Sequence, residues 1–219
     1  NHAFFKALLF LGAGNVNHAT GTFDMRYMGG LWRRMPITYV TTLIGALSLV
    51  GIFPLAGFWS KDEILHHAWE GLGSVDTIVF WTLLVGVFLT AAYTFRMVLM
   101  TFHGEFKGGI DREMAERTDV VATKESHLVH LAESPLVMVL PMVVLAVAAV
   151  ASGYLANPAS DFMGINAHWF THFVVPPNIP VPAILGINLV LAAVVMTVGI
   201  VGICVAVGQN QTRYKSSLP

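Results

Sequence analysis

The sequence predicts an all-α fold, a polytopic membrane helix bundle, and two observations lead to this prediction. Hydrophobic residues make up 55% of the 219 residues and charged residues only 11%, and the mean hydropathy is +0.67. Soluble domains carry roughly a quarter charged residues, so this chain lacks the polar surface that would keep it dissolved. The apolar residues also come in long runs, and a membrane-spanning helix needs about 20 of them.

The apolar runs define the predicted helices in order. Residues 1–14 are apolar from the start, without the charged n-region or cleavage site of a signal peptide. We therefore expect a truncated transmembrane helix and a chain that is a C-terminal fragment. The second predicted helix follows Pro36 and covers residues 37–73. The others cover residues 76–101, 134–155 and 183–208.

Positive charge falls on alternate connections between these helices. Lys and Arg occur in the loops 15–36 and 102–133 and in the tail 209–219, and the loop 156–182 has none. Connections rich in Lys and Arg stay on the cytoplasmic side of a membrane. We therefore expect the first two loops and the tail to be cytoplasmic and the loop 156–182 to lie outside.

Several kinds of chemistry are excluded by composition. The net charge is −1, so we expect no binding of nucleic acid, and the single cysteine, Cys204, excludes a disulfide framework and Cys-ligated metal centres. His168 and His172 lie four residues apart but without a third ligand at a fitting spacing. Glu133 precedes a predicted helix and fits a capping or interface role. We assign no cofactor and no metal site.

Two interpretations of the segment around Lys61 stay open. Pro54 removes a backbone donor, and Gly51 and Gly57 lower helix propensity on either side. In one interpretation the helix only kinks at Pro54 and ends near Ser60, which puts Lys61 at the outer interface. In the other, the helix breaks within the membrane and a second half-helix carries Lys61 at depth, as in ion sites lined by broken helices. An embedded ammonium is costly, which makes it a candidate proton carrier.

Other ionisable residues lie near Lys61 or in the first helix. Asp62 is adjacent to Lys61 but on a helix faces about 100° away, and its neighbour one turn on is His66. His2 and Lys6 form a similar pair on one face of an apolar helix. A lysine so placed lies near an interface or in a buried polar path.

Six stretches of the chain match motifs of a known family. They are His2-Ala-Phe-Phe-Lys6, Met28-Gly-Gly-Leu-Trp-Arg-Arg-Met-Pro36, Gly57-Phe-Trp-Ser-Lys61-Asp-Glu-Ile-Leu65, Tyr93-Thr-Phe-Arg-Met97, Thr101-Phe-His-Gly-Glu-Phe106 and Glu133-Ser-Pro-Leu-Val-Met138. Through these motifs the chain resembles the antiporter-like subunits of proton-pumping NADH:quinone oxidoreductase (respiratory complex I), in particular the type named subunit L or chain 5. The resemblance covers nearly the whole chain and weakens after about Ala156.

The resemblance implies an antiporter-like half-channel with one broken transmembrane helix. Lys61 matches the family's lysine in that helix, Asp62 its neighbour, and His2 and Lys6 the polar residues of a central membrane axis. It implies proton translocation coupled to quinone reduction elsewhere in the complex, with no redox centre in this chain. The implied partners are other membrane subunits, especially an adjacent antiporter-like subunit, and the lipid bilayer. The implied location is the bacterial inner (plasma) membrane or, in a eukaryote, the mitochondrial inner membrane.

Several alternatives remain at the level of sequence, and paralogous chains of the same oxidoreductase and subunits of membrane hydrogenases are among them. A subunit of a multisubunit sodium/proton antiporter would share this fold and much of this pattern, although the Ser60-Lys61-Asp62-Glu63 stretch favours the oxidoreductase. A passive scaffold would use the embedded charges only to pin helices together.

Overall fold

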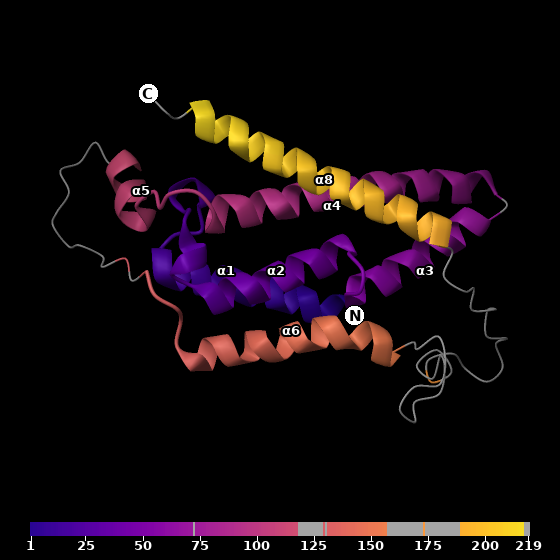
Figure 1. Cartoon of the computed structure of the whole chain (residues 1–219), viewed down its shortest axis with the longest axis horizontal. Coiled ribbons are helices and arrows are strands. Elements are labelled where there is room, and N and C mark those ends of the chain that lie inside the picture. The colour runs from indigo at the N-terminus through magenta and orange to yellow at the C-terminus, as the bar shows by residue number, and fades with distance from the viewer. Residues whose placement is uncertain (72, 118–128, 130, 157–172, 174–188, 217–219) are drawn as a thin grey trace.

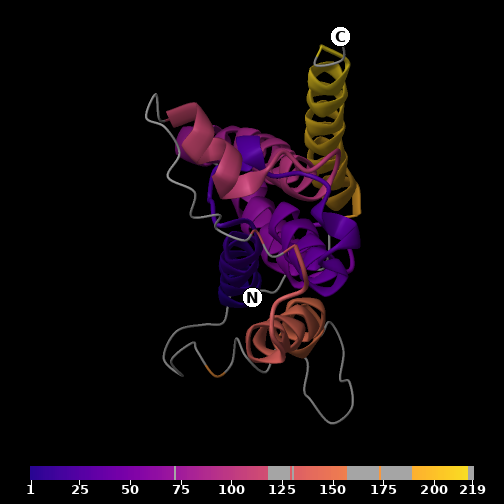
Figure 2. The same cartoon turned by 90° about the vertical axis from the view of Figure 1, so that its left-hand side faces the viewer.

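The chain forms a bundle of helices that lie side by side along its long axis. The computed structural model describes residues 1–71, 73–117, 129, 131–156, 173 and 189–216. Helices α1, α2 and α4 form the middle of the bundle, with α6 on one flank and α8 crossing α4 obliquely on the other (Figure 1, Figure 2). The described elements, all helical, are α1 (His2–Thr20), η1 (Met25–Tyr27), η2 (Leu31–Arg33), α2 (Pro36–Val50), α3 (Ala56–Glu70), α4 (Ser74–Phe102), α5 (Gly109–Arg117), α6 (Leu136–Ala156) and α8 (Leu189–Ser216).

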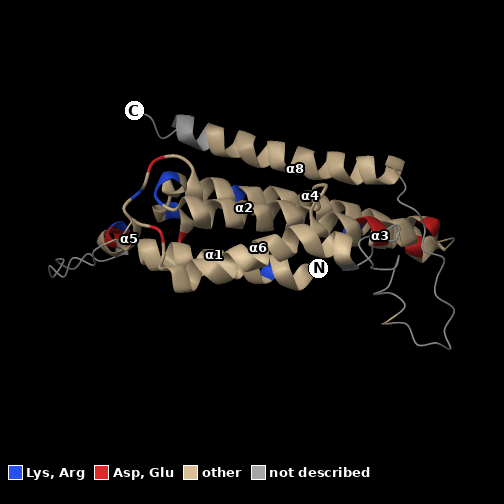
Figure 3. Cartoon of the chain, turned by 60° about the horizontal axis from the view of Figure 1, so that its bottom comes forward, with Lys and Arg blue, Asp and Glu red and all other residues tan. Residues whose placement is uncertain are grey.

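Three of these helices are long and apolar enough to cross a membrane, by length and composition: Ser74–Phe102, Leu136–Leu155 and Leu189–Gln211. Helix α2 is apolar but has only 15 residues. Charged residues gather mainly near α5, in the loop between α1 and α2, and along α3, and α6 has none (Figure 3). An all-α membrane bundle, as the sequence predicts, is confirmed.

Helix α1 is longer than the sequence predicts. It runs to Thr20, whereas we expected it to end at residue 14 and a loop to follow. The bundle buries and pairs the first polar residue after Gly14: Asn15 is 1% exposed and its amide nitrogen donates to Thr38 Oγ1 at 3.2 Å. The helix ends at Gly21, whose positive φ of 71° favours glycine.

The expected loop 102–133 contains a short helix. Helix α5 packs on the segment around η1, where Tyr27 Oη donates to Glu116 Oε2 at 2.8 Å and Thr22 Oγ1 donates to Glu113. The hydrogen bond raises the pKa of Tyr27 and lowers the pKa of Glu116, because it favours the carboxylate as acceptor. Mixed acidic and basic residues suggested a plain surface connection. The helix forms because two of its acids have partners far away in sequence.

The remaining boundaries differ by small amounts, except at the last helix. Helices α4 and α6 begin and end within two residues of the predicted ranges 76–101 and 134–155. Helix α8 begins at Leu189 in the described part and runs to Ser216, into the predicted tail. Apart from Phe173, the predicted outer loop from residue 157 on lies outside the described residues. His168 and His172, which were considered as metal ligands, lie in this part.

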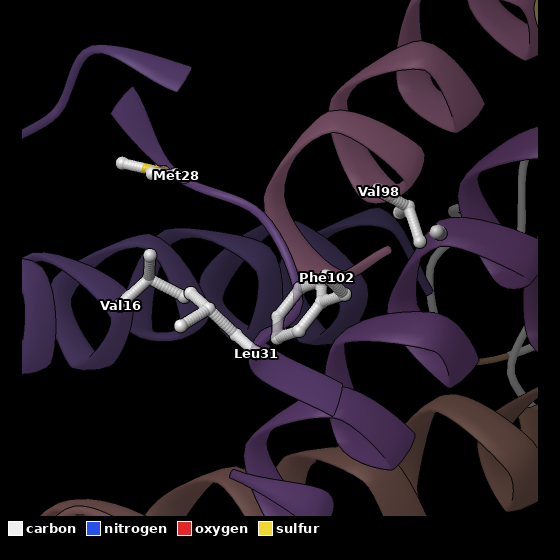
Figure 4. Packing of buried hydrophobic residues seen from close by; sticks show 6 residues of the cluster. Val16, Met28, Leu31, Val98 and Phe102 are labelled. Atoms are coloured by element: carbon white, nitrogen blue, oxygen red, sulfur yellow. The ribbon is translucent and has the colours of Figure 1, made fainter. Parts of the chain in front are cut away.

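A compact apolar cluster fixes the end of the bundle where α1, α2 and α4 meet. Val16 of α1, Leu31 of η2 and Phe102 of α4 are each at most 3% exposed and pack together with Met28 and Val98 (Figure 4). Side chains of this size stabilise the fold by roughly 1.5–3 kcal/mol each when fully buried. The cluster holds the loop between α1 and α2 against the end of α4.

Candidate functional site

A break separates α2 from α3 at the position of interest. Helix α2 ends at Val50, and α3 begins a new hydrogen-bond ladder at Ala56 and runs to Glu70. The interpretation in which one helix kinks at Pro54 and ends near Ser60 is therefore wrong. That the break lies at membrane depth stays a prediction.

A tight turn closes the end of α2 and uses two of its free carbonyls. Gly51 has a φ of 90°, a left-handed conformation that costs glycine little. Its amide donates to Ser48 O at 3.1 Å and the next amide, of Ile52, donates to Leu47 O at 3.1 Å. This is the Schellman arrangement, which satisfies two of the four carbonyls that any helix leaves unpaired at its C-terminus.

The side chain of Lys61 satisfies the other two carbonyls. Its Nζ donates to Leu49 O at 2.5 Å and to Val50 O at 3.1 Å. The ammonium thus lies at the negative end of the α2 dipole, where a cation is stabilised by about 0.3–2 kcal/mol. Because Lys61 reaches back from α3, it also bridges the two half-helices across the break.

A close approach of the two half-helices makes this bridge possible. The amide of Gly57 donates to Ser48 Oγ at 3.2 Å, which pairs one of the free amides at the start of α3. A Cβ added at Gly57 would lie 1.7 Å from Ser48 O, so only glycine permits the contact. Ser48 is not among the residues predicted for the site, since its only signal in the sequence is a hydroxyl one turn before the glycine that ends α2.

Asp62 is buried beside the bridge but does not pair with Lys61. It is 6% exposed, and its Oδ1 has no hydrogen-bond partner among the described residues. One turn further, His66 is also 6% exposed, and its Nε2 lies 3.2 Å from Glu70 Oε1. Asp62 and His66 lie one turn apart on the buried face of α3.

His2 and Lys6 lie elsewhere, on the exposed face of α1. The ring of His2 meets the edge of Phe5, with ring centroids 5.2 Å apart. Phe5 and Leu8 form the buried face of the same helix, at 3% and 0% exposure. Lys61 and Asp62 thus both lie at the break without pairing, and the His2–Lys6 pair faces away from the described bundle.

Glu133 holds the opposite end of α2. Its Oε2 accepts from the amide of Ile37 at 2.8 Å, and its Oε1 accepts from Thr38 Oγ1 at 2.5 Å. A carboxylate at a helix N-terminus satisfies free amides and complements the helix dipole. The capping role expected of Glu133 is thus observed, but on α2 rather than on the helix that follows it in sequence. Helix α2 has a carboxylate at one end and an ammonium at the other.

Among the residues that the structure describes, no group of three or more His, Cys, Asp or Glu side chains is placed to hold a metal ion. The break itself offers three ionisable groups. Lys61 can hold or release a proton at Nζ, and Asp62 and His66 can accept one.

Apolar spans around a broken helix, with a lysine at the break, define an antiporter-like membrane protein. Residues 1–91 match the family described as NADH:quinone oxidoreductase/Mrp antiporter, transmembrane part. The matched segment contains α1, the break and all of the site residues proposed above.

Three curated relatives illustrate the likeness. The chain is 43% identical over 184 residues to subunit 5 of the NAD(P)H-quinone oxidoreductase of the Paulinella chromatophora chromatophore, covering 75% of this chain and 26% of that protein. It is 43% identical over 163 residues to subunit L of the Neisseria meningitidis NADH-quinone oxidoreductase, covering 71% of this chain and 23% of that protein. It is 38% identical over 179 residues to chain 5 of the Marchantia polymorpha NADH-ubiquinone oxidoreductase, covering 81% of this chain and 24% of that protein. The chain spans about a quarter of the length of these relatives.

Proposed function

We propose that this chain is part of a proton-translocating, antiporter-like membrane subunit of an NADH:quinone oxidoreductase, in which Lys61 carries the proton. The observation behind this proposal is the pair of hydrogen bonds from Lys61 Nζ to Leu49 O and Val50 O across the helix break. The names of the relatives, which are all oxidoreductase subunits, favour this function over a sodium/proton antiporter.

The geometry supports a carrier because it ties the charge of Lys61 to the structure of the break. With the proton on, Nζ donates to two carbonyls at the negative end of α2, and charge and dipole attract each other. With the proton off, the attraction is lost and the amine keeps two N–H donors for the same carbonyls. The two protonation states therefore differ in how strongly α3 is held to α2. That difference is what a transport cycle can use.

The rest of the function is inferred from the longer relatives. We infer that quinone reduction occurs in other subunits and that the partners are further membrane subunits, above all an adjacent antiporter-like one. The proposed location is the bacterial inner membrane or the mitochondrial inner membrane. The chain itself contributes the half-channel around the break.

His2 and Lys6 are proposed to continue the proton path outside the described bundle. An ammonium exposed on a membrane helix needs a polar partner, and the exposed face of α1 is open to a neighbouring segment. In the full-length subunit, Lys6→Ala should lower proton pumping while the complex still assembles. Full pumping by this variant would reduce the pair to a packing or interface role.

The test of the carrier is Lys61→Arg and Lys61→Ala in the full-length subunit within the assembled complex. Arginine keeps a charge that it cannot release at neutral pH, and alanine removes the carrier. Proton uptake into reconstituted vesicles should fall in both variants, measured per NADH oxidised. Lys107→Ala, at an exposed position in the loop after α4, is the control and should pump normally.

The same experiment separates the carrier from a passive scaffold. A lysine that only pins α3 to α2 would be replaced by arginine with little loss, because the guanidinium can also donate to carbonyls. Proton uptake at the wild-type rate in Lys61→Arg would therefore refute the proposal that Lys61 carries the proton.

A further inference from the structure

An apolar groove of about 630 Å³ runs between α2 and α6, which lie side by side in the bundle (Figure 1). Branched aliphatic side chains form most of its walls: Ile37, Val40 and Ile44 of α2, and Val143, Val147 and Val150 of α6. Their spacing of three or four residues puts each set on one face of its helix. Val40 and Val147 are more than half exposed, so the groove opens to the surroundings of the bundle.

The groove itself offers no polar group to a ligand. The one hydroxyl among its described walls belongs to Thr41, whose Oγ1 donates to Ile37 O at 2.8 Å. Lipid chains are as apolar as leucine, so apolar contact alone gains little over contact with the bulk bilayer. A specific ligand of this groove therefore needs a polar group that is recognised at one of its ends.

Two arginines lie at the end of the groove where α2 begins. Arg33 and Arg34 come just before Pro36, which lines the groove. Both are exposed, and neither forms an ion pair with an acid among the described residues. Glu133 lies at the same end, but its oxygens accept hydrogen bonds from α2 itself. The positive charge of the two arginines thus remains available to an anion.

The geometry of Arg33 suits a phosphate. Its Cζ lies over the ring of Trp32, 4.7 Å from the ring centroid. Stacking on an aromatic ring uses the flat face of a guanidinium, and the N–H donors at its edge form the fork that matches a phosphate. An anion held here would lie beside the mouth of an apolar groove, which is the arrangement of headgroup and chain in a phospholipid.

The length of the groove favours a lipid chain over a helix of a partner. Its walls extend from Pro36 to Ile44 in α2 and from Val143 to Ala151 in α6, about 12 Å each at 1.5 Å per residue. One leaflet supplies about 15 Å of hydrocarbon, whereas a spanning helix would need a seat of about 30 Å. Helices in membranes also pack on small residues, and these walls are mainly branched.

We propose that the groove between α2 and α6 binds an acyl chain of an anionic phospholipid, whose phosphate is held by Arg33 and Arg34. In the predicted orientation these arginines are cytoplasmic, and basic pockets between helices on that side of a membrane bind anionic headgroups. The site lies at the opposite end of α2 from Lys61 and involves no proton transfer. The inference therefore goes beyond the proposed function and does not depend on it.

Cross-linking with a photoactivatable lipid tests the site in the full-length subunit within the assembled complex. The complex is reconstituted with phosphatidylglycerol or phosphatidylcholine carrying the same diazirine-labelled chain, and mass spectrometry locates the labelled residues. Labelling of Val201, exposed on α8, serves as the reference for ordinary boundary lipid. Relative to this reference, phosphatidylglycerol should label the walls of the groove at least fivefold more than phosphatidylcholine.

Three variants assign the effect to the arginines and the groove. Arg34→Gln should lower groove labelling by phosphatidylglycerol about fivefold, which corresponds to the contribution of about 1 kcal/mol from one basic residue near an anionic surface. Lys107→Gln is the matched control, because it removes one charge at an exposed position in another loop on the same predicted side, and it should change nothing. Val147→Trp fills the groove from its open side and should lower labelling of Val150 by both lipids.

Two results would overturn the proposal. If both lipids label the groove equally, or if Arg34→Gln labels like Lys107→Gln, the groove holds only ordinary boundary lipid. If Val201 is labelled but the groove is not, a protein segment covers it. Neither result bears on Lys61, since proton uptake by Lys61→Arg tests the proposed function separately.

Discussion

Replacing Gly57 by alanine tests whether the close contact between α2 and α3 holds the lysine site together. The added Cβ would lie 1.7 Å from Ser48 O, and ordinary contact begins at 3.4 Å, so the start of α3 must move by about 3.4 − 1.7 = 1.7 Å. A comparable shift would stretch the 2.5 Å bond from Lys61 Nζ to Leu49 O beyond hydrogen-bonding distance. Overpacking costs about 1–3 kcal/mol and a lost bond to a charged group about 1.5–3 kcal/mol. We expect a loss of about 3 kcal/mol, or roughly 100-fold in the equilibrium that keeps the break closed.

Hydrogen exchange at the break measures this loss directly. The amides of Gly51 and Ile52 are bonded to the end of α2 and should exchange roughly 100-fold faster in Gly57→Ala of the full-length subunit in detergent. Gly86→Ala is the control, because a Cβ there meets nothing within 4 Å and alanine favours a helix by up to about 1 kcal/mol. Exchange at Gly51 and Ile52 at the wild-type rate in Gly57→Ala would refute the reasoning that the contact is tight and needed.

Three further predictions concern the start of α2, the docking of α5 and the orientation of the chain in the membrane. Glu133→Ala removes the hydrogen-bond acceptor at the start of α2 and should lower the free energy of unfolding by about 1 kcal/mol, measured from the midpoint of thermal unfolding. Glu133→Gln keeps an acceptor and should lose less stability. An equal loss in both variants would contradict a cap that needs only an acceptor. Because the hydrogen bond to Tyr27 lowers the pKa of Glu116, it should stabilise the docking of α5 at pH values above the usual pKa of a glutamate, and this stabilisation should be lost as the pH falls through the lowered value. Hydrogen exchange of the α5 amides should show this acid transition, and Tyr27→Phe should move the transition to higher pH. With Cys204 replaced by serine, a cysteine introduced by Thr123→Cys should resist membrane-impermeant reagents in intact cells, and labelling from outside would refute the predicted orientation.

Residue patterns that act over short distances were sufficient for the broad architecture. Apolar runs of about 20 residues predict membrane helices because burial in lipid depends on each helix by itself. Local residues also indicated where the second helix is weakest, since Gly51, Pro54 and Gly57 lie within one short segment and lower its helix propensity. The position of Lys61 just after these residues was enough to single it out.

Only the tertiary structure decided what the polar groups do, because their partners are far apart in sequence. It showed that α1 continues past Gly14, since Asn15 is paired with Thr38 in another helix. It also showed that Glu133 caps a helix about 95 residues before it, a pairing that no local pattern indicates.

For the candidate site, too, the sequence indicates one part and the tertiary structure decides the other. The sequence determined that an ionisable group follows a segment of low helix propensity, but it left open whether the helix breaks there or merely kinks. The structure decided this, because it placed Lys61 Nζ on the two carbonyls of α2 that the closing turn leaves free. Backbone carbonyls look identical in every sequence, and which of them lacks a partner depends on how the chain folds back on itself.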